Sequence, residues 1–164
     1  MLLSWLLVVI TLIVAGFLIA LPFTGLDGLW ETRSATRLVL TAAAGLIILI
    51  NTAYQDGSSL NLPPKLLRAV ARLACFLIAP LIVLAIWALA LRIGQYGLTP
   101  ERVIGAACAV VGAAYALGYA LAGVSRTNWL KPIEHTNVGA AVLSVTLILS
   151  ILSPLADPAR LLRL

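Results

Sequence analysis

Long apolar runs separated by short polar segments define the pattern of this chain. Five runs approach or reach the roughly 17 to 25 residues that an α-helix needs to cross a bilayer. No segment shows the period-two alternation that is typical of a half-buried strand. The pattern therefore predicts an all-α, polytopic integral membrane helical bundle. We expect one transmembrane domain over residues 1–164, with spans at about 2–22, 37–54, 68–92, 101–123 and 137–153.

The densest polar segment lies between two of these runs, from Arg92 to Arg102, and predicts a tight helix–turn–helix hairpin at a membrane surface. Arg92 is expected to end one helix, and Gly94 and Gly97 allow the backbone to turn. Beyond the turn, a threonine can cap the next helix with its side-chain oxygen, a proline fits the first helical position, and a glutamate faces the positive end of the helix dipole. The residues of this motif between the two arginines are Gln95, Tyr96, Gly97, Thr99, Pro100 and Glu101.

Small side chains dominate residues 103–123, the core of the fourth predicted span. Twelve of these 21 residues are Gly or Ala, and five of them recur at spacings of three or four positions, on one face of a helix. Because lipid supplies no hydrophobic drive between helices, small residues serve to let helices approach closely. We therefore expect this span to be the buried centre of the bundle, packing through Gly105, Ala109, Gly112, Ala116 and Ala120.

Composition excludes a soluble domain. The chain is 62% hydrophobic and 10% charged, whereas about a quarter of the residues in a soluble domain are charged. The net charge of +5 comes from Lys and Arg scattered among the polar segments, without the basic face and interleaved aromatics of nucleic-acid-binding proteins. We expect these cations, including Arg68 and Arg72 one helical turn apart, to reach lipid headgroups. The expected partners are membrane lipids, not nucleic acid.

No catalytic or metal-binding constellation is recognisable in the sequence. His135 is the single histidine, and Cys75 and Cys108 are predicted at different membrane depths, which argues against a metal site or a disulfide. Neither a phosphate-binding glycine loop nor a nucleophile elbow occurs. The cores of the predicted spans carry no ionisable residue, and such residues usually mark a transport or proton path. We therefore expect a protein that is not an enzyme and that has no cofactor or metal.

Six motifs follow one another along most of the chain: Asn51 with residues 54–57, Arg92 with residues 95–102, residues 115–120, Trp129-Leu130, Asn137-Val138 and residues 153–158. With these motifs the sequence resembles a bacterial polytopic membrane protein family of unknown function, domain-of-unknown-function family 4153. The resemblance implies a multi-pass protein of the bacterial inner membrane with no established activity. It also implies that this chain corresponds to the C-terminal part of a longer membrane region.

Two functions remain open on this basis. The first, which we favour, is a non-enzymatic structural or assembly component that packs against other membrane helices or a second copy of the chain. It would expose an apolar or small-residue stripe beyond what five helices can bury.

The second function is a transporter or lipid-handling component in which Arg92 and Arg102 bind lipid phosphate or another anion, since guanidinium groups bind such oxygens in a bidentate manner. It would show a polar-lined cavity at the hairpin. Simple extension of both arginines to the headgroups is the alternative to such a site. Asn51, Asp56, Gln95 and Tyr96 are interpreted as caps and turn residues.

Overall fold

A computed structural model describes residues 2–25, 34–54, 63–125 and 129–153, and every regular element within them is a helix. Each of these helices is long and apolar enough to cross a membrane. The prediction of an all-α, multi-pass membrane bundle is therefore confirmed. In chain order the helices are α1 (Leu2–Thr24), α3 (Ala35–Tyr54), α4 (Lys65–Tyr96), α5 (Pro100–Val124) and α6 (Pro132–Leu152).

Two helices extend further than the apolar pattern indicates. α4 continues one turn beyond Arg92, so the arginine does not end the helix as expected. α6 begins at Pro132 and includes Glu134 and His135, which the sequence pattern left in a loop. Proline is preorganised for the first position of a helix, and a carboxylate is favourable in the first turn. These local signals lengthen α6 before its apolar run begins.

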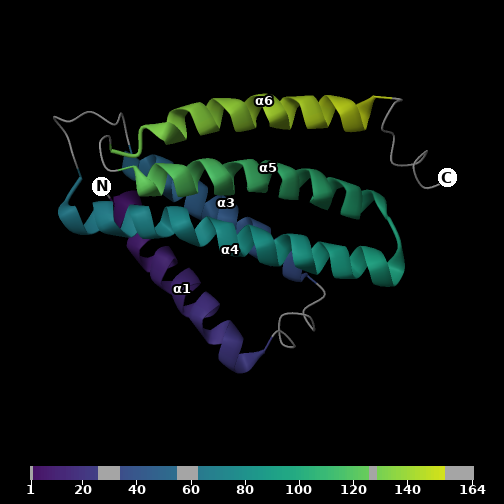
Figure 1. The fold of residues 1–164 in the computed structure, drawn as a ribbon, viewed down its shortest axis with the longest axis horizontal. Helices are drawn as coiled ribbons and strands as arrows, with labels where there is room; N and C mark the ends of the chain where they lie inside the picture. The colour runs from purple at the N-terminus through teal and green to yellow at the C-terminus, as the bar shows by residue number, and fades with distance from the viewer. Residues whose placement is uncertain (1, 26–33, 55–62, 126–128, 154–164) are drawn as a thin grey trace.

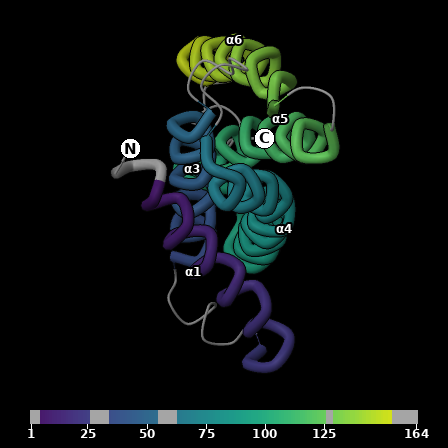
Figure 2. The backbone as a smooth tube through the Cα atoms, turned by 90° about the vertical axis from the view of Figure 1, so that its left-hand side faces the viewer, coloured from purple at the N-terminus to yellow at the C-terminus, as the bar shows by residue number. Residues whose placement is uncertain are grey.

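α3, α4, α5 and α6 lie side by side, while α1 diverges from them along its length (Figures 1 and 2). α4 packs against α1, α3 and α5, and it contains ten buried residues, compared with six in α5. The centre of the bundle is therefore α4, and the expectation that residues 103–123 form it is wrong. A helix of small residues approaches its neighbours closely but has little side-chain volume to bury. α5 buries one large side chain completely, that of Tyr119, whereas α4 buries several aliphatic ones, including Ile78 and Leu81.

Two glycines of α5 make close helix contact possible on two different faces. A Cβ on Gly112 would come within 2.5 Å of Ile82 Cδ1 in α4, and a Cβ on Gly118 would come within 2.7 Å of Thr136 Cβ in α6. α5 is thereby held between α4 and α6. Lipid gives membrane helices no hydrophobic drive to associate, so close contact through small residues is what holds them together.

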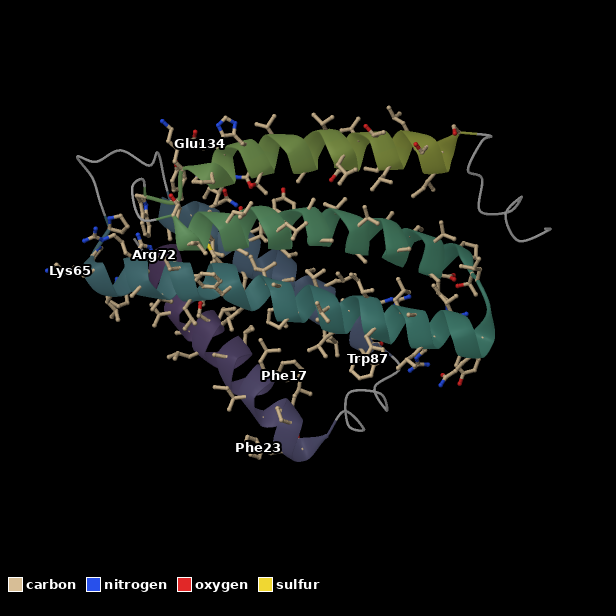
Figure 3. All side chains as sticks on the ribbon, viewed as in Figure 1. Phe17, Phe23, Lys65, Arg72, Trp87 and Glu134 are labelled. Carbon is tan, nitrogen blue, oxygen red and sulfur yellow. The ribbon has the colours of Figure 1, made fainter. Side chains whose placement is uncertain are left out.

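α6 and α1 are attached to the bundle over only part of their lengths. In α6, Ile133 and Ala140 are the buried residues, and both lie in its first half. In α1, the side chain of Phe23 near the far end is 87% exposed. Figure 3 shows Phe17 of α1 and Trp87 of α4 on the two sides of the wedge that opens between these helices. Both side chains are exposed among the described residues.

Candidate functional site

Three polar side chains from three helices form a closed ring of hydrogen bonds, here called the polar ring. Asn51 Nδ2 of α3 donates to the hydroxyl of Tyr119 in α5 at 2.7 Å. That hydroxyl donates to Asn137 Oδ1 of α6 at 2.9 Å, and Asn137 Nδ2 donates back to Asn51 Oδ1 at 2.6 Å. Each side chain is thus both donor and acceptor, and Tyr119 is fully buried. The ring ties α3, α5 and α6 together near the membrane face where α6 begins.

A second polar contact reinforces the same end of the bundle. The hydroxyl of Tyr54, in the last turn of α3, donates to Glu134 Oε1 in the first turn of α6 at 2.6 Å. A hydrogen bond to a carboxylate is about twice as strong as a neutral one. Tyr54 is 7% exposed, so its side chain is held in place by packing as well. These two side-chain contacts between α6 and α3 both lie within the first two turns of α6.

At the opposite end, α4 and α5 meet in the predicted hairpin. Gly97 follows α4 with φ of +74°, in the left-handed region that favours glycine, and its N–H donates to the carbonyl of Ile93 at 2.8 Å. Gly94, also expected at the turn, lies inside α4 instead. Thr99 is the N-cap of α5 with Pro100 next to it, as predicted, but its side chain makes no capping hydrogen bond. The Thr99 carbonyl instead accepts from the backbone N–H of Arg102 and Val103.

The ring of Tyr96 lies close to Arg92 and Arg102, the two arginines predicted from the sequence to contact an anion. Its ring centroid lies 6.0 Å from Cζ of Arg92 and 5.6 Å from Cζ of Arg102. Arg102 also donates to the carbonyl of Gly97. Both guanidinium groups are therefore within cation–π distance of one exposed ring. Tyr96 is more than a turn residue, while Gln95 is exposed in the last turn of α4.

A groove of about 1300 Å³ opens between α3, α5 and α6 and extends to this hairpin. Its walls are mainly aliphatic, with Leu40 and Ile47 from α3, Val111 from α5 and Leu147 from α6 among them. The charged side chains that line it all lie at the hairpin end: Arg37, Arg92, Glu101 and Arg102. Tyr115 lines it one helical turn before Tyr119 of the polar ring. The groove is thus apolar along its length and positively charged at one end, where three arginines outnumber one glutamate.

The predicted small-residue stripe of α5 divides between two environments. Ala109, Gly112 and Ala116 are buried, while Gly105 and Ala120 are half-buried. Gly105 and Gly112 face Leu89 and Ile82 of α4, and both glycines also line the groove. Cys108 is exposed in the groove, whereas Cys75 is buried, and the two are not bonded.

Sequence reasoning missed the polar ring because Asn51 was interpreted as a cap. α3 continues for three residues beyond Asn51, so the amide points across the bundle rather than at its own helix end. An asparagine within an apolar run is itself a signal, since amides hydrogen-bond between membrane helices. Arg37 and Gly118 were also not singled out for the roles the structure gives them. Asp56 lies outside the described residues, and so does the motif over residues 153–158 apart from Ser153.

Within the part of the chain that the structure describes, no group of three or more His, Cys, Asp or Glu side chains could hold a metal ion.

Searches of curated proteins and of solved structures found no match to this chain. The family described as Domain of unknown function (DUF4153) matches residues 1–158, nearly the whole sequence. With the helical bundle and the motifs described above, the chain is a multi-pass membrane protein that belongs to this family.

Proposed function

We propose that this protein binds an anionic phospholipid in the groove between α3, α5 and α6. The observation that carries the proposal is an apolar groove whose charged side chains are confined to one end. A phospholipid has the same distribution of properties: a charged phosphate at one end and apolar chains beyond it. This is a lipid-handling role in the bacterial inner membrane, without catalysis and without a cofactor.

The phosphate would lie at the hairpin, between Arg37, Arg92 and Arg102. Two of these cations lie near the ring of Tyr96, and Glu101 is the single acidic side chain that lines the groove. Like charges held close together repel each other unless an anion lies between them. Arginine pairs bind phosphate oxygens through parallel hydrogen bonds. Arg37 is exposed and lies close enough to the carboxylate of Glu101 to attract it electrostatically, as Arg102 does, so one acidic group faces three arginines here.

The acyl chains would lie along the aliphatic walls. From Arg102 to Tyr115 the groove follows α5 for roughly 20 Å, at a rise of about 1.5 Å per residue. One leaflet contributes about half of the ~30 Å hydrocarbon core. The groove is therefore long enough for a chain that starts at the headgroup layer of one leaflet. A water-soluble anion would leave these walls without a partner, which favours lipid over a small polar substrate.

Native mass spectrometry of the purified protein with phosphatidylglycerol and phosphatidylcholine would test this proposal. The wild type should retain phosphatidylglycerol in preference to phosphatidylcholine. Arg37→Gln combined with Arg102→Gln should weaken that binding by at least about tenfold, because charged hydrogen bonds contribute about 1.5–3 kcal/mol each. Lys131→Gln, an exposed cation at the other membrane face, is the control and should bind as the wild type does. Equal retention of both lipids by the wild type would contradict the proposal.

A structural or assembly role is the second candidate. The observation that favours it is the exposure of α6, whose buried residues are limited to Ile133 and Ala140. A membrane helix of a partner, or of a second copy, could cover its outer face. Mass measurement by light scattering in nanodiscs distinguishes the two cases, since an assembly role requires a defined oligomer and lipid binding does not.

A further inference from the structure

The end of the bundle opposite the hairpin carries a cluster of positive charge that makes no ion pair among the described residues, here called the basic notch. Lys65, Arg68 and Arg72 lie in the first two turns of α4 at spacings of three and four residues, on one face of the helix. With Ala69 they line a depression of about 250 Å³. Lys65 and Arg72 are seen at this end in Figure 3. The notch shares no residue with the groove and does not depend on the function proposed for it.

Both arginines of the notch are half-buried. The Nε atoms of Arg68 and Arg72 are buried and make no hydrogen bond among the described residues. A freely extended arginine would keep these atoms in contact with water. Here protein encloses the inner nitrogens and leaves the rest of each side chain half-buried.

The start of α4 adds to the excess of positive charge at the notch. Its first turn contains no acidic residue, and its N-cap, Pro64, offers no side-chain hydrogen bond. The N-terminus of a helix is the positive end of its dipole, where cations are unfavourable and anions are stabilised. Three like charges within two turns also repel one another. The unpaired Nε atoms, the helix dipole and the charge repulsion therefore all favour an anion at this position.

Distance along α4 places the notch at a headgroup layer. Arg72 and Arg92 are 20 residues apart in α4, or about 30 Å, which equals the thickness of a bilayer hydrocarbon core. If Arg92 lies at one boundary of the core, Arg72 lies at the other, and Lys65 lies in the headgroup region beyond it. Leu73 and Phe76, immediately inside this boundary, are exposed. A phosphate at the notch would thus have an apolar surface below it for acyl chains.

We propose that the basic notch formed by Lys65, Arg68 and Arg72 is a second phospholipid site, which binds the phosphate of an anionic lipid in the leaflet opposite the groove. The outer nitrogens of Arg68 and Arg72 donate to the phosphate oxygens, and Lys65 supplies a third positive charge from the headgroup layer. The lipid thereby provides the negative charge that the first turn of α4 lacks.

The test uses nanodiscs of phosphatidylcholine with and without phosphatidylglycerol, and compares wild type with Arg68→Gln/Arg72→Gln. Phosphatidylglycerol should raise the midpoint of thermal unfolding of the wild type, and this rise should be clearly smaller in the double variant, which keeps only the groove as a lipid site. In phosphatidylcholine alone the double variant should be at least as stable as the wild type, because charge repulsion has been removed. A structural role for these arginines predicts the opposite, a variant that is destabilised in both lipids.

Three comparisons sharpen the result. Arg68→Lys/Arg72→Lys keeps the charge but loses the paired hydrogen bonds, so it should retain part of the response. Arg37→Gln/Arg102→Gln should leave the response of the notch intact, which separates this site from the groove. Inorganic phosphate added to phosphatidylcholine nanodiscs should have no effect; an equal stabilisation by free phosphate would overturn the assignment to a lipid. An unchanged phosphatidylglycerol response in Arg68→Gln/Arg72→Gln would overturn the site itself.

Discussion

Asn51 of α3 and Asn137 of α6, 86 positions apart in the sequence, are joined side chain to side chain by a hydrogen bond of 2.6 Å. The hydroxyl of Tyr119 closes the ring on the other side. In a bilayer an amide without partners is costly, since no water is available to replace them. The ring therefore specifies one register for α6 against α3 and α5, because sliding α6 by a single turn would break both hydrogen bonds of Asn137.

Tyr119→Phe should lower the stability of the bundle by about 1–2 kcal/mol. The change removes two interhelical hydrogen bonds without altering the shape of the ring, and such bonds contribute about 0.6 kcal/mol on average and up to about 1.7 in membrane proteins. Unfolding in mixed micelles of increasing SDS content measures the loss. Tyr115→Phe, one turn earlier in α5, is the matched control. Its hydroxyl makes no hydrogen bond among the described residues, so that variant should unfold as the wild type does.

Gly118→Ala should separate α6 from α5. The new methyl group would lie 2.7 Å from Thr136 Cβ, an atom that cannot move away without its backbone. Overpacking of this kind costs about 1–3 kcal/mol. Gly139→Ala in α6 meets nothing within 4 Å and should be neutral or stabilising, by up to about 1 kcal/mol of helix propensity. The same SDS titration compares them, and equal stability of the two variants would contradict the close contact.

Thr11→Val in α1 should stabilise the protein by about 1 kcal/mol. Thr11 is 1% exposed, and its hydroxyl oxygen is buried without a hydrogen-bond partner in the described structure. Valine has nearly the same shape and removes the penalty of an unpaired polar group. Thr136→Val serves as the comparison, because the Thr136 hydroxyl donates to the carbonyl of Pro132 at 3.0 Å and its loss should be destabilising. Thermal unfolding in detergent reports both changes, and a destabilised Thr11→Val would show that its hydroxyl is in fact bonded.

Cys108 should report directly on occupancy of the groove. It is exposed and lines the groove, whereas Cys75 is buried, so a maleimide should modify Cys108 and leave Cys75 unmodified in the folded protein. Phosphatidylglycerol should slow this reaction several-fold in the wild type and have little effect in Arg37→Gln/Arg102→Gln. Mass spectrometry of the intact protein follows the reaction over time. Labelling that is indifferent to phosphatidylglycerol would place the lipid elsewhere.

The helices were predictable because their length is set by bilayer thickness and their ends by Pro, Gly and charge. The faces by which they pack were not predictable. When nearly every position of a helix is apolar, the hydrophobic pattern does not distinguish lipid from protein, and α4 could not be recognised as the centre. Glycine spacing singled out Gly112 as a packing residue without naming its partner helix, and it missed Gly118, which lies on another face of α5.

The candidate site was predictable in part. Arg92 and Arg102 were identified from local sequence, and the structure places Tyr96 near both. Arg37 joins them from α3, more than fifty residues earlier, and only the packing of helices reveals this. The polar ring was likewise only partly predictable. Each of its three members belongs to a sequence motif, but their hydrogen bonds depend on which faces α3, α5 and α6 turn toward one another.

The sequence distance across the polar ring has a consequence for biosynthesis. A ribosome adds about 5 to 20 residues per second, so Asn137 is made roughly 4 to 17 s after Asn51. During that interval α3 can enter the bilayer while its partner in α6 does not yet exist. The bond from Asn51 Nδ2 to the carbonyl of Ile47, 2.8 Å long and internal to α3, needs no other helix. It can shield the nascent amide from lipid until α5 brings Tyr119 and α6 completes the ring.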